Sequence, residues 1–216
     1  AASHFVREQE LISVIGEDFP KEFLSTLDSR GVGSEGLVTI KGGKSFFWEG
    51  SYHEDLIGRD TITTELNVLE GWSPTVPPNA LHSKFVMLGN LDPSVQFSVI
   101  EQLESTPSLI VLDTMNFWMD IAMDSLKKVI AKVDVLMIND DEARQLTGFK
   151  TLPLAAEAVH KMGPKTVVIK KGEHGAIMFE EDQVFFSPAM PLKKVVDPTG
   201  AGDTFAGGFI GYLARL

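Results

Sequence analysis

The residues from Val196 to Phe209 combine a tight turn, several glycines and a carboxylate. Pro198 restricts the backbone, while Gly200 and Gly202 permit conformations and close approaches that a side chain would prevent. From Ala201 onward an apolar residue recurs at every fourth position: Phe205, Phe209 and Leu213. This spacing places the apolar side chains on one helical face. The run therefore predicts a turn that leads directly into a helix.

The segment Gly200-Ala201-Gly202-Asp203 would form the first turn of that helix. Unpaired amides and the positive end of the helix dipole bind anions there, each charge contact contributing roughly 0.3–1 kcal/mol. Asp203 then has two interpretations, which need not exclude each other. It complements the dipole, or it takes the proton from an attacking hydroxyl while the amides hold a phosphate, an effect of roughly 10²–10⁴-fold in rate.

The longer run Asp197-Pro198-Thr199-Gly200-Ala201-Gly202-Asp203-Thr204-Phe205, with Gly207-Gly208, resembles the C-terminal signature of the ribokinase-like (PfkB) carbohydrate kinases. The resemblance implies that Asp203 is the catalytic base and contacts the acceptor hydroxyl. It implies that Gly200, Ala201 and Gly202 form the anion hole. It also places Asp197 and Thr199 near the nucleotide, where many members of the family bind a monovalent cation such as K⁺.

A second segment, Asn139-Asp140-Asp141-Glu142, resembles the family's Asn-x-x-Glu motif. The resemblance implies that Asn139 approaches the nucleotide ATP and that Glu142 orients hydrated Mg²⁺, an ion that keeps several waters and takes few protein carboxylates. The residue types alone equally predict that Asn139 caps a helix and that Glu142 is its capping-box partner.

A third segment, from Lys170 to Ala176, resembles the strand, turn and strand that lie beside the nucleotide in this family. Gly172 and Gly175 keep the turn, whereas lysines replace the usual Thr-Leu pair. A lysine near the phosphates, for which Lys170 is the candidate, would add positive charge. The alternative is an exposed lysine with no ligand.

The elements that must position these residues alternate along the chain. Short apolar runs predict strands at Leu11–Ile15, Lys84–Leu88, Leu109–Leu112, Val133–Ile138 and Thr166–Lys170. Helical spacing follows most of them, at Pro20–Arg30, Pro93–Leu103, Met119–Ala131 and Asp140–Thr147. This alternation predicts an α/β fold with a mainly parallel sheet covered on both faces. The resemblance implies the ribokinase-like three-layer α/β/α arrangement.

Residues 34–67 break this alternation with short strands around Gly42-Gly43. They are expected to form a β-rich insertion between two parts of one core, 1–33 and 68–216. The resemblance implies a small β lid over the acceptor site, which often pairs with a second subunit and so predicts a possible homodimer. Trp48 is a candidate substrate-binding residue, and the alternative is that it fills the packing face of the lid.

Composition limits the other functions. The chain has 216 residues, a formal net charge of −11 and no cysteine. The acidic balance argues against nucleic-acid and anionic-membrane surfaces, and the lack of cysteine excludes disulfides and thiolate chemistry. The five histidines have no metal-binding spacing. The sequence has neither a signal peptide nor a long apolar run, so a cytoplasmic location is expected.

These features together predict ATP- and Mg²⁺-dependent phosphorylation of a sugar hydroxyl. A nucleoside acceptor is the alternative, because Phe117 and Trp118 suit a base as well as a sugar ring, although both also suit a core. A catalytically silent fragment that keeps the fold is the other alternative. Compared with the family, the chain is expected to be truncated at both ends. No P-loop run and no protein-kinase motif set is present.

Overall fold

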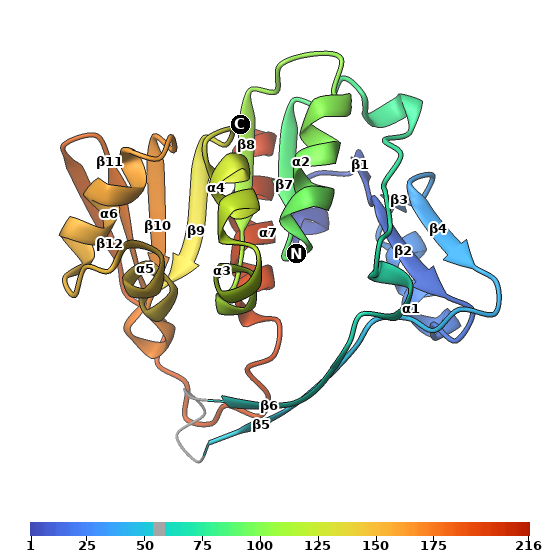
Figure 1. Cartoon of the computed structure of the whole chain (residues 1–216), viewed down its shortest axis with the longest axis horizontal. Coiled ribbons are helices and arrows are strands. Elements are labelled where there is room, and N and C mark those ends of the chain that lie inside the picture. The colour runs from blue at the N-terminus through green and yellow to red at the C-terminus, as the bar shows by residue number, and fades with distance from the viewer. Residues whose placement is uncertain (54–58) are drawn as a thin grey trace.

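The computed structural model describes residues 1–53 and 59–216, and a six-stranded sheet forms its centre (Figure 1). The strand order is β12-β11-β10-β9-β8-β7. The strands are β7 (Phe85–Leu88), β8 (Leu109–Asp113), β9 (Val135–Asn139), β10 (Thr166–Lys170), β11 (Ala176–Glu180) and β12 (Gln183–Ser187). Strands β7 to β10 are parallel, whereas β11 and β12 are antiparallel. The predicted α/β fold with a mainly parallel sheet is confirmed.

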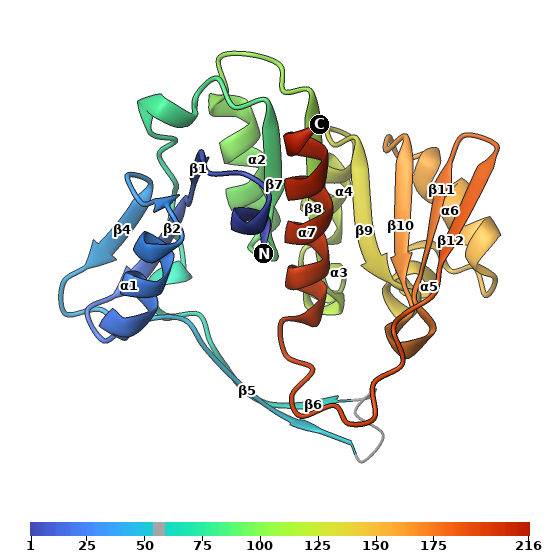
Figure 2. The same ribbon diagram turned by 180° about the vertical axis from the view of Figure 1, so that it is seen from behind.

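Helices cover both faces of this sheet, which gives three layers (Figures 1 and 2). One face carries α2 (Pro93–Gln102), α3 (Asn116–Ile121), α4 (Met123–Ile130), α5 (Asp140–Thr147) and α6 (Leu152–His160). The opposite face carries α7 (Ala201–Arg215). The single helix predicted for Met119–Ala131 is interrupted, because Ala122, with φ of −141° and ψ of 30°, leaves the helical conformation and ends α3 before α4 begins.

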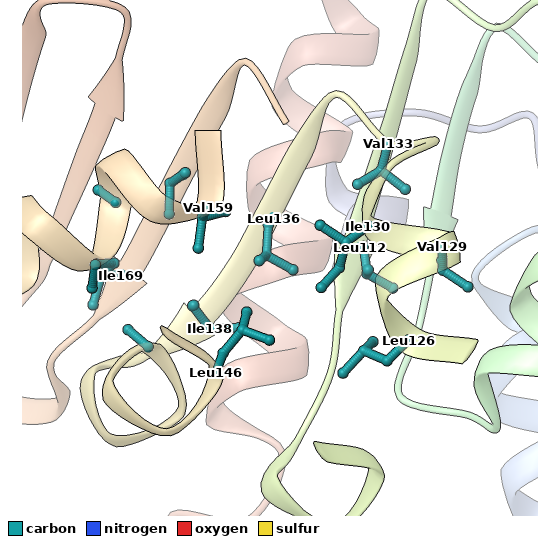
Figure 3. Packing of buried hydrophobic residues seen from close by; sticks show 14 of the residues in the cluster. Leu112, Leu126, Val129, Ile130, Val133, Leu136, Ile138, Leu146, Val159 and Ile169 are labelled. Carbon is teal, nitrogen blue, oxygen red and sulfur yellow. The ribbon is translucent and has the colours of Figure 1, made fainter. Parts of the chain in front are cut away.

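The core sits between these layers, and the alternation of side chains along each strand explains it. In β8, Leu112 packs with the helices of the first face, whereas its neighbour Val111 packs toward α7. Both side chains are fully buried. Figure 3 shows the first cluster, in which Leu136 and Ile138 of β9 lie among side chains of the flanking helices. Burial on both faces explains why these strands are continuously apolar.

The N-terminal part of the chain forms separate small elements beside the main sheet. They are η1 (Ala2–His4), β1 (Gln9–Glu10), β2 (Ser13–Gly16), α1 (Lys21–Ser29), β3 (Val32–Gly33) and β4 (Leu37–Ile40), followed by the short 3-10 helices η2 (Asn67–Leu69) and η3 (Pro78–Ala80). The first residues form a single 3-10 turn that packs on α7.

The segment 34–67, expected as one insertion, divides into two parts in the structure. Strand β4 pairs in parallel with β2, which belongs to the preceding segment. Only β5 (Phe47–Tyr52) and β6 (Arg59–Glu65) form a separate antiparallel hairpin. The part of the expected insertion at 54–58 lies outside the described residues. Figures 1 and 2 show the hairpin running past the carboxyl ends of the parallel strands and the start of α7.

Candidate active site

The carboxyl ends of three neighbouring parallel strands carry polar side chains at one edge of the sheet. Asp113 ends β8, Asn139 ends β9 and Lys170 ends β10. Lys170 lies directly opposite Asn139 in the ladder. Helix α7 begins near the same edge of the sheet (Figure 2). In open α/β sheets, this edge is where ligands bind.

The first turn of α7 has the geometry of an anion site. Gly200 is its N-cap, with φ of 75° in the left-handed region that glycine tolerates and other residues rarely adopt. Its lack of a side chain leaves the turn without a side-chain cap. The Ala201 amide donates to the Pro198 carbonyl at 3.1 Å. The amides of Gly202 and Asp203 occupy the next positions, which have no acceptor within an α-helix.

Lys170 lies against this turn and forms an ion pair with Asp113. Its Nζ donates to Asp113 Oδ1 at 2.7 Å, and the two side chains are 17% and 7% exposed. A methyl group added to Gly202 would come within 3.1 Å of the same Nζ. Because Gly202 has no side chain, the Lys170 ammonium can lie close to the helix.

The pKa of Asp113 reflects this surrounding. Burial raises the pKa of its carboxyl, whereas the charge and hydrogen bond of Lys170 lower it and the negative charge of Asp203 raises it further. Burial is the largest of these effects. Asp203 is thus close enough to influence Asp113.

Asp203 itself is exposed and borders a cavity of about 450 Å³. Gly207 lies on the same wall one helical turn later, and the N-terminal segment supplies other lining residues, including His4, Gln9 and Arg30. A carboxylate in this position can reach a ligand that enters the cavity.

The loop before α7 contains Asp197 and Thr199. Asp197 Oδ1 accepts the Thr199 amide hydrogen at 2.9 Å. Hydrogen bonding to the Thr199 side chain, and then to this amide, lowers the pKa of the exposed Asp197 carboxyl. The Tyr52 hydroxyl and the Thr199 Oγ1 hydroxyl hydrogen-bond at 3.0 Å, which joins the hairpin to the loop. Tyr52 and Thr199 lie far apart in the sequence, so no sequence pattern predicted this contact.

Asn139 and Glu142 form a capping box at the start of α5. Asn139 Oδ1 accepts from the Glu142 amide at 2.8 Å, and Glu142 Oε2 accepts from the Asn139 amide at 2.7 Å. The capping-box interpretation is thereby confirmed, and Glu142 is only 5% exposed. Their roles toward nucleotide and Mg²⁺ remain predictions.

The donor set constrains how Mg²⁺ would be held. Within residues 1–53 and 59–216, no three His, Asp or Glu side chains gather in a metal-binding group. Mg²⁺ commonly takes one or two carboxylates and otherwise keeps water and substrate phosphates. Glu142 is the carboxylate that the sequence assigns to such an ion, and that assignment remains a prediction.

The turn between β10 and β11 requires both of its glycines. Gly172 and Gly175 have φ of 53° and 88°. A Cβ on Gly175 would lie 1.9 Å from the Ser187 carbonyl oxygen, a distance that no real contact allows. These glycines set the path of the chain directly after Lys170, and contact with a nucleotide remains a prediction for both.

Trp48 lies on β5 and packs within the hairpin. Its Nε1 donates to Thr61 Oγ1 at 3.3 Å, and its ring occupies the space that a side chain on Gly50 would need. This arrangement agrees with the packing alternative. A role in substrate binding remains a prediction.

The sequence of this chain matches a known protein family. Residues 1–215 match the sequence profile of the pfkB family carbohydrate kinases. The chain belongs to the pfkB family. A cytidine kinase from Thermococcus kodakarensis is 32% identical over 212 residues, covering 95% of this chain and 73% of that enzyme. A nucleoside kinase from Methanothermobacter thermautotrophicus is 25% identical, covering 93% of this chain and 64% of that enzyme.

Solved structures of a ribokinase and a nucleoside kinase share the fold. Arabidopsis thaliana ribokinase complexed with ribose and ATP has a TM-score of 0.78 at 21% identity, covering 99% of this chain and 72% of that one. Burkholderia thailandensis nucleoside kinase in complex with inosine has a TM-score of 0.78 at 18% identity, covering 99% and 69%. The ribokinase-like fold is thus confirmed. In the described part of the chain, none of the helices has the length and apolar character needed to cross a bilayer.

Proposed function

We propose that this chain carries the catalytic turn of an ATP-dependent kinase that phosphorylates a hydroxyl of a nucleoside or sugar. One observation carries the proposal. The left-handed Gly200 opens an uncapped helix whose first turn holds an exposed carboxylate, Asp203, and lies against the ammonium of Lys170. A base, amide donors and a cation are thus gathered where the family signature lies.

In the proposed reaction, Asp203 accepts the proton of the acceptor hydroxyl as the oxygen attacks the γ-phosphorus of ATP. The bond between the γ-phosphorus and the bridging oxygen breaks, and ADP leaves with that oxygen. The amides of Gly202 and Asp203 donate to the oxygens of the transferring group, where negative charge is stabilised. Mg²⁺ bound to the phosphates would neutralise charge, with Glu142 as the candidate that orients its waters.

A nucleoside is the favoured acceptor. The relative that matches this chain at 32% identity is named a cytidine kinase, and a second match is named a nucleoside kinase. A sugar acceptor is the second candidate, because the fold is shared with a ribokinase complexed with ribose. Asp197 and Thr199 are the candidate residues for a monovalent cation beside the nucleotide.

Substitution of Asp203 tests the mechanism. In Asp203→Asn, transfer of phosphate from ATP to a panel of nucleosides and sugars should fall by about 10²–10⁴-fold, because the proton acceptor is lost. ATP affinity measured by calorimetry should change little. Asp182→Asn, a change in the exposed turn between β11 and β12, is the matched control. Unchanged turnover in Asp203→Asn would refute the base, and ATP binding without any turnover in the unmodified chain would favour a silent binding protein.

A further inference from the structure

Asp113 is a buried acid at a position where packing alone would favour an apolar residue. It ends β8, whose preceding residues Val111 and Leu112 are fully buried. The lysine that pairs with it comes from β10, and β9 lies between these two strands in the sheet. Lys170 therefore reaches across the end of the intervening strand. Such a pair needs a reason, because burying two charges is often no better than burying apolar side chains.

The position of the ammonium suggests the reason. One hydrogen bond from Lys170 Nζ goes to Asp113, and a lysine ammonium has three donors. The same Nζ lies next to Gly202, whose amide belongs to the first turn of α7. The ammonium is thus fixed beside the proposed anion site, while donors remain for a second acceptor.

We propose that Asp113 is a positioning residue, which holds the Lys170 ammonium against the first turn of α7 so that it binds the phosphate chain of a nucleoside triphosphate. The inference rests on the proposed function and deepens it, because it names the Lys170 ammonium as the positive charge that binds phosphate beside the amides of α7. Asp113 touches neither the nucleotide nor the acceptor in this role. It acts only through Lys170.

The local charge balance supports this role. Asp113 and Asp203 both lie near the turn, and the negative charge of Asp203 acts on Asp113. Without Lys170, the two negative charges near the turn would repel an incoming polyphosphate. With Lys170 paired, Asp113 is neutralised and the ammonium still presents its other donors. The competing explanation is a purely structural ion pair, which would make no distinction between ligands with and without phosphate.

Calorimetry with ATP and with adenosine separates these explanations. Lys170→Met should weaken ATP binding by about tenfold or more, because a charge-assisted hydrogen bond to phosphate is lost. Adenosine binding should stay within about twofold, since the base and sugar carry no charge for the ammonium to bind. Lys170→Arg keeps the charge and should retain most of the ATP affinity. Lys165→Met, which changes an exposed lysine just before the start of β10, is the matched control and should bind ATP normally.

The effect of Asp113 should depend on Lys170. Asp113→Asn should weaken ATP binding by about threefold to tenfold in the unmodified chain but cause no further loss in Lys170→Met, because the two residues act as a unit. Additive losses, or equal losses for ATP and adenosine, would overturn the proposal. Circular dichroism and thermal unfolding check that each variant folds. If Asp113→Asn does not fold, Asp113→Glu is tested in its place.

These binding results are separate from the outcome of the kinase assay. ATP binding that depends on Lys170 in a chain that transfers no phosphate would refute the proposed function while supporting the paired lysine. Phosphate transfer that is lost in Asp203→Asn but unchanged in Lys170→Met would support the proposed function and refute the role of the paired lysine.

Discussion

At the scale of single residues, the buried pair of Asp113 and Lys170 makes the stability of the chain depend on pH. Burial already raises the pKa of Asp113, and Lys170 is the cause that most lowers it. In Lys170→Met the pKa of Asp113 should therefore rise further. An unpaired buried carboxylate at neutral pH should reduce the free energy of unfolding by on the order of 3 kcal/mol.

The sign of the pH dependence follows from proton binding. When the pKa of an acid is higher in the folded than in the unfolded state, the folded state binds more protons between the two values. Stability in Lys170→Met should fall as pH rises above the ordinary aspartate value of 3.8 and level off above the folded pKa. Urea unfolding at several pH values measures this. The double variant Asp113→Asn with Lys170→Met should lose the added pH dependence, and its persistence would assign the effect to another group.

The sequence predicted single residues well where a linear motif carried them. Asp203 and the glycines before it lie at the start of a helix as expected, because the turn and the helix are local. The same was true of Asn139 and Glu142, whose spacing of three residues defines a capping box. Asp113 with Lys170, and Tyr52 with Thr199, could not be paired from sequence, because sheet order and hairpin placement bring them together.

At the scale of elements, α7 offers a contrast between two glycines three residues apart. A Cβ on Gly208 would meet nothing within 4 Å, whereas a Cβ on Gly211 would lie 2.8 Å from the Ala2 Cα. Gly208→Ala should raise the free energy of unfolding by about 0.5–1 kcal/mol, because alanine favours a helix. Gly211→Ala should lower it by about 1–3 kcal/mol through overpacking against the N-terminal turn.

Thermal and urea unfolding of the two alanine variants measure this difference. Equal effects of the two substitutions would contradict the close packing of the N-terminal turn on α7. That packing includes the edge-to-face contact of Phe5 with Tyr212, whose ring centroids are 5.9 Å apart. Phe5→Ala should therefore weaken the penalty of Gly211→Ala, because a loosened N-terminal turn can move away from the added methyl group.

The sequence predicted buried elements better than exposed ones. Strands β8, β9 and β10 are near-continuous apolar runs because both faces are covered, and that pattern is visible without a structure. The pairing of β4 with β2 was missed, because parallel strands are not joined by a tight turn that could be recognised in the sequence. The break at Ala122 was also missed, because α3 and α4 continue the same apolar spacing.

At the scale of the whole molecule, the hairpin β5–β6 lies apart from the main sheet (Figure 1). Phe47 is 49% and Ile62 is 61% exposed. A two-stranded ribbon alone is marginally stable, and a large apolar exposure on it marks an association surface. We expect a second copy of the chain to cover this ribbon, which is the homodimer predicted from the lid.

Light scattering on the chain at micromolar concentration tests this assembly. Ile62→Lys should shift the population toward monomer, because a charge would be buried in the interface without a partner. Val184→Lys is the matched control, since Val184 is 65% exposed on the edge strand β12, which belongs to a different sheet from the hairpin. A monomeric unmodified chain would refute the dimer. An equal shift in both variants would place the contact at β12 or make it nonspecific. Because Tyr52 of the same ribbon hydrogen-bonds Thr199 before the proposed catalytic turn, a monomeric Ile62→Lys variant should also bind acceptor more weakly.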